Sequence, residues 1–329
     1  MNVHRIGLTR QEKFSIAPFV GFYYPLMGIC LPEIAKVLER HLAAWVPNPE
    51  IIHNIRIGRE PFSYASYSLA KKNDIPFVLT PLHHPRWSGW LHRYYLDLYR
   101  KADAVIALTG SEKLTLIGLG VDESRIHVTG IGPVLADSWD AERFRQKFSL
   151  GKDPFILFLG QKYAYKGIDI LLQSTSKVWK KFPEARFIFI GPRTDYSSKL
   201  FSTISDSRIL ELDKVDLQTK TDALAACTML CVPSSQESFG GVYTEAWMFE
   251  KPVIGLDIPA VSEVIDHEVN GLLVDSKPEA VANCILEILS NQILAQSLGA
   301  AGFKKVKECY SWDYLAFRTR QIYQSVLYK

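Results

Sequence analysis

Short apolar stretches alternate with longer amphipathic stretches along most of this 329-residue chain. The clearest series starts with the apolar run at residues 155–159 and ends at residues 272–274. Strands that are apolar throughout are typical of parallel sheets covered by helices on both faces. Parallel strands need a long crossover between them, usually a helix, so the alternation predicts an α/β protein.

The alternation occurs twice, on either side of a segment at residues 130–154 that starts Gly-Ile-Gly-Pro and contains Gly151. Gly and Pro mark this segment as a crossing between domains. We therefore expect two Rossmann-like domains. Strands are expected at residues 51–53, 77–80, 104–108, 126–128, 155–159, 186–190, 208–212, 229–232, 253–256 and 272–274. Helices are expected at residues 60–73, 87–101, 111–119, 168–181, 195–205, 218–226, 241–249, 278–290, 292–308 and 312–327.

Composition excludes several other classes of protein. The net charge of +3 is too small to indicate a nucleic-acid-binding surface, and the five cysteines form no Cys-x-x-Cys pair that would indicate a zinc site. No secretory signal is visible, so a reducing cytoplasmic location is expected. Residues 14–32 carry no charge but contain three prolines, which favours a buried or interfacial segment over a membrane-spanning helix.

Ligands of doubly wound folds bind beyond the carboxyl ends of the strands, so we looked there for chemistry. The most specific motif is PSSQESFGGVYTEA, residues 233–246, after the apolar run 229–232. A helix that starts at Gly241 would offer its backbone N–H groups to a diphosphate. Glu237 and Glu245, on either side of the glycines, could accept hydrogen bonds from sugar hydroxyls. The alternative is a Gly-rich turn between two surface carboxylates.

Three further motifs follow strands. In GQKYAYKG, residues 160–167, Lys162 and Lys166 are expected on the rim of the crevice, as phosphate ligands or as solvated lysines. In TPLHHP, residues 80–85, a histidine could contact the reacting group or merely cap a loop, and no third ligand for a metal is apparent. Gly130-Ile131-Gly132-Pro133 is a hinge, a loop beside the ligand or a plain turn.

Four stretches together carry a resemblance to a known family: FILFLGQKYAYKGIDILL, RFIFIGP, CVPSSQESFGGVYTEAW and KPVIGLDIPAVSEVIDHEVNGLLVD. They resemble the donor domain of the retaining GT-B glycosyltransferases of family 4. ADAVIALTGSEK and EIIHN match the family's acceptor domain more loosely. Two features depart from the family pattern. The opening strand and Gly-rich loop of the acceptor domain are not visible, and Gln161, followed by Lys162, stands where the family usually has Arg.

The resemblance implies a GT-B fold with two Rossmann-like domains facing a cleft, the first one shortened. Residues 1–135 would form an incomplete acceptor-side domain and residues 136–310 the nucleotide-sugar donor domain, with residues 311–329 as a helix crossing back. Glu237 would support the oxocarbenium-like transition state, His84 would be the acceptor-domain histidine and Glu245 would bind ribose. The remaining donor-binding residues would be Gly160, Lys162, Lys166, Ser238, Phe239, Gly240 and Gly241.

The function expected on this basis is transfer of a sugar, with retained configuration, from a UDP-, GDP- or ADP-linked donor. The acceptor would be a glycan or a lipid-linked precursor of polysaccharide biosynthesis. No metal or cofactor would be needed, because lysines and a helix N-terminus would neutralise the diphosphate. Residues 1–150 carry four more basic than acidic groups, weak support for peripheral contact with the inner face of a membrane. The alternative is a non-catalytic nucleotide-sugar-binding module, or a partner subunit of a glycosyltransferase.

Overall fold

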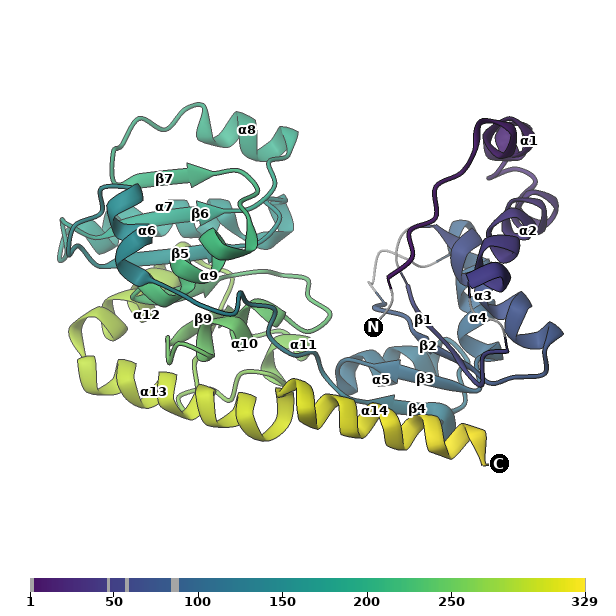
Figure 1. Cartoon of the computed structure of the whole chain (residues 1–329). Coiled ribbons are helices and arrows are strands. Elements are labelled where there is room, and N and C mark those ends of the chain that lie inside the picture. The colour runs from purple at the N-terminus through teal and green to yellow at the C-terminus, as the bar shows by residue number, and fades with distance from the viewer. Residues whose placement is uncertain (1–2, 46–47, 57–58, 84–88, 329) are drawn as a thin grey trace. The chain divides into compact units, whose positions relative to one another are not determined.

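The computed structural model describes residues 3–45, 48–56, 59–83 and 89–328. The chain forms two compact units (Figure 1). The first comprises Met1–Thr129 with Phe317–Lys329, and the second Gly130–Ala316. The chain therefore passes between the units at residue 130 and again within its last helix, where the sequence suggested boundaries at residues 135 and 310.

The second unit is built on one parallel sheet with the strand order β10-β9-β8-β5-β6-β7 (Figure 1). Every strand starts and ends within one residue of its expected bounds. The strands are β5 (Phe155–Leu159), β6 (Arg186–Ile190), β7 (Ile209–Leu212), β8 (Met229–Val232), β9 (Val253–Leu256) and β10 (Leu272–Val274). Every residue of β5, β8 and β9 is buried, and so is every residue of β6 except the first. This is why continuous apolar runs marked them so clearly in the sequence.

Helices connect the strands of the second unit. They are η3 (Ala164–Lys166), α7 (Ile168–Trp179), α8 (Asp195–Phe201), α9 (Leu217–Ala226), α10 (Gly241–Trp247), α11 (Pro259–Ser262), α12 (Pro278–Ser290) and α13 (Gln292–Lys305). A π-helical turn, η4 (Val306–Tyr310), extends α13, and α14 (Trp312–Leu327) follows.

The expected crossing segment at residues 130–154 contains a helix, α6 (Ala141–Lys147), that the sequence analysis did not predict. Its N-cap is Asp140, whose carboxylate accepts the backbone N–H groups of Glu142 and Arg143. A two-bond ion pair holds it to α9, with Arg143 Nε and Nη2 2.6 and 2.7 Å from the Asp222 carboxylate. Seven residues are too few to show a helical period, so this element could only be found from its packing.

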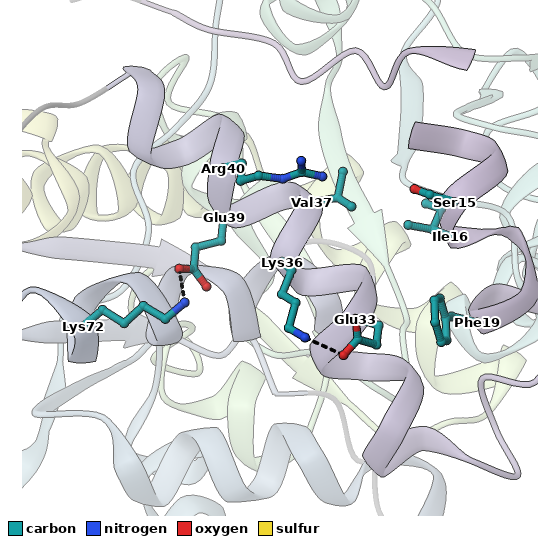
Figure 2. A pocket seen from close by; sticks show the side chains of 9 residues that line it. All are labelled: Ser15, Ile16, Phe19, Glu33, Lys36, Val37, Glu39, Arg40 and Lys72. Carbon is teal, nitrogen blue, oxygen red and sulfur yellow. Dashed lines mark hydrogen bonds and ion pairs between the residues drawn. The ribbon is translucent and has the colours of Figure 1, made fainter. Parts of the chain in front are cut away.

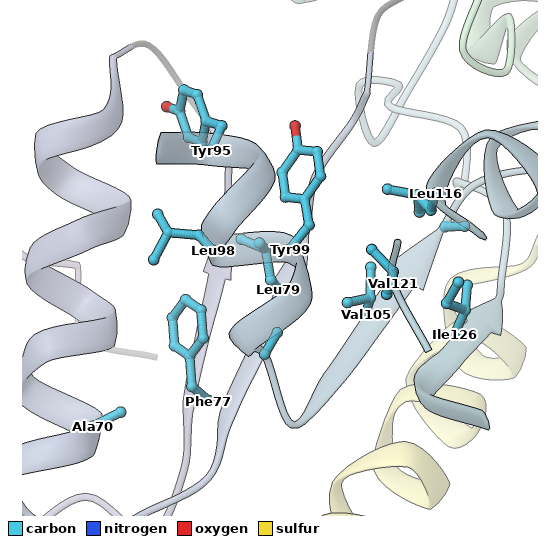
Figure 3. Packing of buried hydrophobic residues seen from close by; sticks show 12 residues of the cluster. Ala70, Phe77, Leu79, Tyr95, Leu98, Tyr99, Val105, Leu116, Val121 and Ile126 are labelled. Atoms are coloured by element: carbon cyan, nitrogen blue, oxygen red, sulfur yellow. The ribbon is translucent and has the colours of Figure 1, made fainter. Parts of the chain in front are cut away.

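The first unit contains a parallel sheet in the order β1-β2-β3-β4. Its strands are β1 (Ile52–Ile55), β2 (Phe77–Thr80), β3 (Ala104–Ala107) and β4 (Ile126–Val128), and its helices include α3 (Glu60–Lys72), η1 (Trp90–His92), α4 (Arg93–Lys101), α5 (Gly110–Gly118) and η2 (Glu123–Arg125). Figure 3 shows the core on one side of this sheet, where Leu98 and Tyr99 of α4 lie against Phe77 and Leu79 of β2. The last turns of α14 cover the other side, where Ile322 packs with buried residues of β2 and β3.

The uncharged segment 14–32 consists of parts of two helices and the turn between them. It spans the end of α1 (Arg10–Gly21) and the start of α2 (Met27–Trp45), and α2 packs along α3 (Figure 1). Tyr23, Met27 and Leu31 are buried in this packing, whereas Phe22 and Ile29 are 61% and 63% exposed. Within the described residues, no helix is long and apolar enough to cross a membrane.

Candidate functional site

The second unit has a hollow of about 530 Å³ at the carboxyl ends of β5 and β6. Gly160 and Gly191, each directly after its strand, line it together with Lys220 and Glu245. A Cβ at Gly191 would overlap the Gly160 carbonyl oxygen, so only glycine lets the two strand ends approach this closely. The sequence prediction that ligand-binding residues gather at these strand ends therefore has a matching cavity.

Glu245 reaches this hollow from α10, which begins at Gly241 as the sequence predicts. The residue is 8% exposed, and its Oε1 accepts a hydrogen bond of 2.7 Å from Lys220 Nζ. The backbone N–H of Val134 also points to Oε1, at 3.3 Å. Burial raises the pKa of Glu245, and the Lys220 ammonium opposes this rise. Sequence reasoning missed Lys220, because only the packing of α9 beside α10 brings it to Glu245.

Glu237 is paired with the other lysine of the site. Lys166 Nζ donates to Glu237 Oε1 at 2.6 Å, and both side chains are mostly buried. The loops that carry them also touch, since the backbone N–H of Ser235 donates to the Tyr165 carbonyl at 2.8 Å. A side chain at Gly167 would overlap the Pro233 carbonyl oxygen. The structure thus brings together two motifs that are 70 residues apart in the sequence. In the same loop, Gln236 Oε1 is buried without a hydrogen-bond partner among the described residues.

The turn between the two glutamates packs on the start of the second unit. Phe239 is buried and meets Tyr310 edge-to-face, with ring centroids 5.1 Å apart. Gly240 adopts φ +82°, and the half-buried Ser238 lies in the same turn. The Gly-Ile-Gly-Pro motif completes this packing, because a Cβ at Gly130 would lie 2.7 Å from the Tyr310 ring. The motif is therefore a close-packed loop beside the Phe-Gly-Gly turn.

Lys162 is placed differently from the prediction, which put it on the exposed rim. Its side chain is fully buried, forms an ion pair with Glu211 and donates to the Leu212 carbonyl at 2.7 Å. Glu211 is also bound by Arg193, at 2.6 Å. Lys162 therefore connects the loop after β5 to the end of β7. The sequence spacing identified a lysine at a strand end but could not show which way its side chain turns.

In the first unit, His83 is buried after β2, and its backbone N–H donates to Glu112 Oε1 at 2.5 Å. The other oxygen of Glu112 accepts the backbone N–H of Leu108 at 2.7 Å, so one carboxyl group ties together the ends of β2 and β3. Burial raises the pKa of Glu112 to about 7. His84, the expected acceptor-domain histidine, lies outside the described residues.

Another hollow of the first unit lies between α1 and α2 (Figure 2). Two pairs of its charged groups bind each other: Lys36 binds Glu33 and Lys72 binds Glu39, each at 2.5 Å, and Arg40 also lines the hollow. Across the part of the chain that the structure describes, no group of three or more His, Cys, Asp or Glu residues is placed to hold a metal ion.

The two parallel sheets, one of them with two glutamates around a Phe-Gly-Gly turn at its strand ends, are the arrangement expected for the GT-B glycosyltransferase class. Comparison with known proteins identifies the family. The family description "Glycosyl transferases group 1" matches residues 140–305, and "Glycosyltransferase Family 4" matches residues 7–132. The chain belongs to the glycosyl transferases group 1, within glycosyltransferase family 4.

Three curated relatives show how far the similarity extends. An uncharacterized glycosyltransferase of Methanocaldococcus jannaschii is 28% identical, over 97% of this chain and 77% of the relative. A D-inositol 3-phosphate glycosyltransferase of Xylanimonas cellulosilytica is 29% identical, over 68% and 57%. A phosphatidyl-myo-inositol mannosyltransferase of Mycobacterium tuberculosis is 28% identical, over 52% and 47%. For the last two, the chain spans only about half of the relative's length.

Solved structures support the same fold at low sequence identity. Anabaena HepE in complex with UDP and glucose has a TM-score of 0.75 and 18% identity, over 89% of this chain and 80% of that chain. Sucrose-phosphate synthase from Thermosynechococcus elongatus also has a TM-score of 0.75 and 18% identity, over 97% and 80%. At this identity the likeness establishes the GT-B fold and leaves the donor and acceptor to be inferred from the chain's own residues.

Proposed function

We propose that this protein transfers a sugar from a nucleotide-linked donor to an acceptor hydroxyl and retains the configuration at the anomeric carbon. The observation that carries the proposal is the pairing of two glutamates, each with its own lysine, at one end of the second sheet. Glu245 and Lys220 line the 530 Å³ hollow. Glu237 and Lys166 join the two neighbouring loops. The UDP complexes among the structural neighbours favour UDP as the nucleotide.

The buried Glu245 carboxylate would accept the hydroxyl groups of the ribose. Lys220 keeps this carboxylate oriented, and its positive charge opposes the effect of burial on the pKa of Glu245. Gly160 and Gly191 carry no side chain, so the donor can approach the strand ends closely. Ribose and base would thus be held by the sheet end, with the diphosphate directed toward the loops of Lys166 and Glu237.

The Lys166 ammonium would neutralise charge that builds up on the departing diphosphate. Glu237 would bind hydroxyl groups of the donor sugar and stabilise positive charge at its anomeric carbon. These two side chains bind each other at 2.6 Å, which restricts the movement of both. We propose that a bound metal is not required, with Lys166 supplying the charge. Transfer should then persist in EDTA, and loss of activity that magnesium or manganese restores would contradict this step.

The first unit would bind the acceptor. We propose a glycan or lipid-linked acceptor and a peripheral contact with a lipid surface. The support is the set of exposed apolar side chains on α1, α2 and the turn between them, namely Phe14, Val20, Phe22, Leu26 and Ile29. Arg10 and Lys13, exposed on α1, would add attraction to anionic lipids.

The test is incubation of the full chain with UDP-, GDP- and ADP-sugars, followed by proton NMR of the released or transferred sugar. Turnover of one donor, with product of the donor's own anomeric configuration, is expected. Product of the opposite configuration would contradict the retaining reaction. Binding of a nucleotide sugar without turnover would favour the alternative, a non-catalytic module or partner subunit.

A further inference from the structure

The first unit has a pocket with several charged lining residues at the carboxyl end of β1. Its volume is about 440 Å³. The lining comes from the segment after β1, the start of α3, the short helix η1 and α4. It includes Tyr24, Arg56, Arg59, Glu60, His92 and Tyr95.

The first notable group in this pocket is Glu60, which is only 1% exposed. Its Oε2 accepts the hydroxyl of Tyr23 at 2.9 Å, whereas its Oε1 has no hydrogen-bond partner among the described residues. His92 Nδ1 lies 3.9 Å from Oε1, and this nitrogen is also buried and also without a hydrogen-bond partner within the described chain. A buried polar atom without a partner costs stability, so such atoms usually mark a place for water or a ligand.

The second notable feature is the charge of the lining. Arg56 is 5% exposed, stacks on the Tyr95 ring at 3.6 Å and donates to the Tyr99 hydroxyl at 2.6 Å. Arg59 is exposed beside Tyr24. Burial and the neighbouring Arg56 lower the pKa of His92. The lining thus contains two arginines and one glutamate.

The aromatic rings fix this arrangement. Tyr95 and Tyr99 are buried in the core of the first unit, and Figure 3 shows their hydroxyl groups pointing away from the apolar cluster. The ring face of Tyr95 and the hydroxyl group of Tyr99 both contact the guanidinium of Arg56 and restrict its movement. The hollow between α1 and α2 lacks such features, because its lysines and glutamates bind one another.

We infer that this pocket binds a sugar or polyol that carries an anionic group, either a phosphate or a carboxylate. Glu60 Oε1 and His92 would bind hydroxyl groups, and Arg56 with Arg59 would bind the anion. If the protein has the proposed function, this pocket is the acceptor site, and the inference then gives the chemical class of the acceptor.

Isothermal titration of the full chain with four probes tests this inference: glucose 6-phosphate, glucuronate, glucose and inorganic phosphate. We expect glucose 6-phosphate or glucuronate to bind at least tenfold more tightly than glucose and than inorganic phosphate. The anionic probe that binds more tightly identifies the group. Equal binding of glucose and both anionic probes, or binding of none, would overturn the inference.

Two variants separate the roles of the pocket residues. Glu60→Gln should reduce the preference for glucose 6-phosphate over inorganic phosphate at least tenfold, because it removes an acceptor without removing the arginines. A merely structural role of Glu60 would weaken both probes equally and leave the preference unchanged. Arg59→Gln should weaken the binding of both anions. Arg40→Gln, at an exposed position of α2 in the hollow between α1 and α2, is the matched control and should weaken neither.

Titration with UDP in the same variants distinguishes this inference from the proposed function. Glu60→Gln and Arg59→Gln should bind UDP as the unmodified chain does, because the donor hollow lies in the second unit. If the unmodified chain binds glucose 6-phosphate but no nucleotide, the inference about the pocket is supported and the proposed function is contradicted. If it binds UDP but no anionic sugar, the pocket inference fails alone.

Discussion

The two sheets of this protein end in different electrostatic environments. In the second unit, Glu237 and Glu245 are each bound by a lysine at 2.6–2.7 Å. In the first unit, Glu60 keeps one buried oxygen without a partner among the described residues and lies in a pocket with two arginines. The two second-unit carboxylates are therefore each held in place by a lysine. The first-unit pocket, in contrast, contains a buried carboxylate oxygen that no described residue binds.

The largest effect should come from Glu237. If it supports charge at the anomeric carbon, Glu237→Gln should lower turnover about a hundredfold to a thousandfold while the affinity for UDP changes little. Initial rates with the preferred donor and UDP titration measure the two effects. Glu279→Gln is the control, since Glu279 is also paired with a lysine, Lys177, but is 78% exposed. Equal activity of the two variants would make the Glu237 pair a structural contact only.

The Lys162→Met variant tests whether Lys162, like the other lysines at the strand ends of the second unit, contributes to donor binding. Lys162→Met removes one partner of a buried ion pair, so the free energy of unfolding should fall by about 3 kcal/mol. The value lies at the low end for such a change because Glu211 keeps Arg193. Urea unfolding measures this loss, and the affinity for UDP should not change. A tenfold loss of UDP affinity at unchanged stability would instead indicate that Lys162 binds the donor.

A smaller effect concerns pH in the first unit. His53 on β1 contacts Tyr323 at 2.7 Å and Thr80 at 2.8 Å, and burial lowers its pKa to about 4. Between pH 6.5 and 4 the unfolded chain binds a proton that the folded unit does not. The stability from this group should therefore fall with decreasing pH, by up to about 1.4 kcal/mol per pH unit.

Urea unfolding at pH 7, 5.5 and 4.5, compared between the unmodified chain and His53→Gln, isolates this contribution. The substitution should flatten the loss of stability below pH 6.5. An identical pH dependence in both proteins would show that His53 is not held neutral.

The sequence was sufficient for the second sheet and for the positions of the two glutamates at its end, but not for Lys220. Buried strands such as β5 are continuous apolar runs, and Glu237 and Glu245 lie at a spacing that one turn and one helix can serve. The sequence could not predict the direction in which an individual side chain points. Lys162 and Lys166 belong to one motif, yet one is buried against Glu211 and the other pairs with Glu237.

The first unit was harder to predict because its features depend on contacts between distant residues. The prolines of residues 14–32 favoured a buried or interfacial segment over a membrane-spanning helix, but they did not show that Pro18 and Pro32 lie inside α1 and α2. Tyr23, 37 residues from Glu60, occupies one oxygen of that carboxylate. No spacing rule connects Glu60 with Tyr23 or with His92, so the pocket could be found only from the folded chain.

The most direct test of the central claim is a thermal-shift comparison of the unmodified chain and Glu245→Gln with UDP-, GDP- and ADP-sugars. A donor at 100 times its dissociation constant should stabilise the unmodified chain by about 2.7 kcal/mol. One nucleotide class should raise the melting temperature. At the same concentration, Glu245→Gln should lose most of this shift, because a hydrogen bond to a charged group contributes about 1.5–3 kcal/mol to binding. No shift with any nucleotide sugar, or an equal shift in both proteins, would contradict the assignment of this strand-end hollow as the donor site.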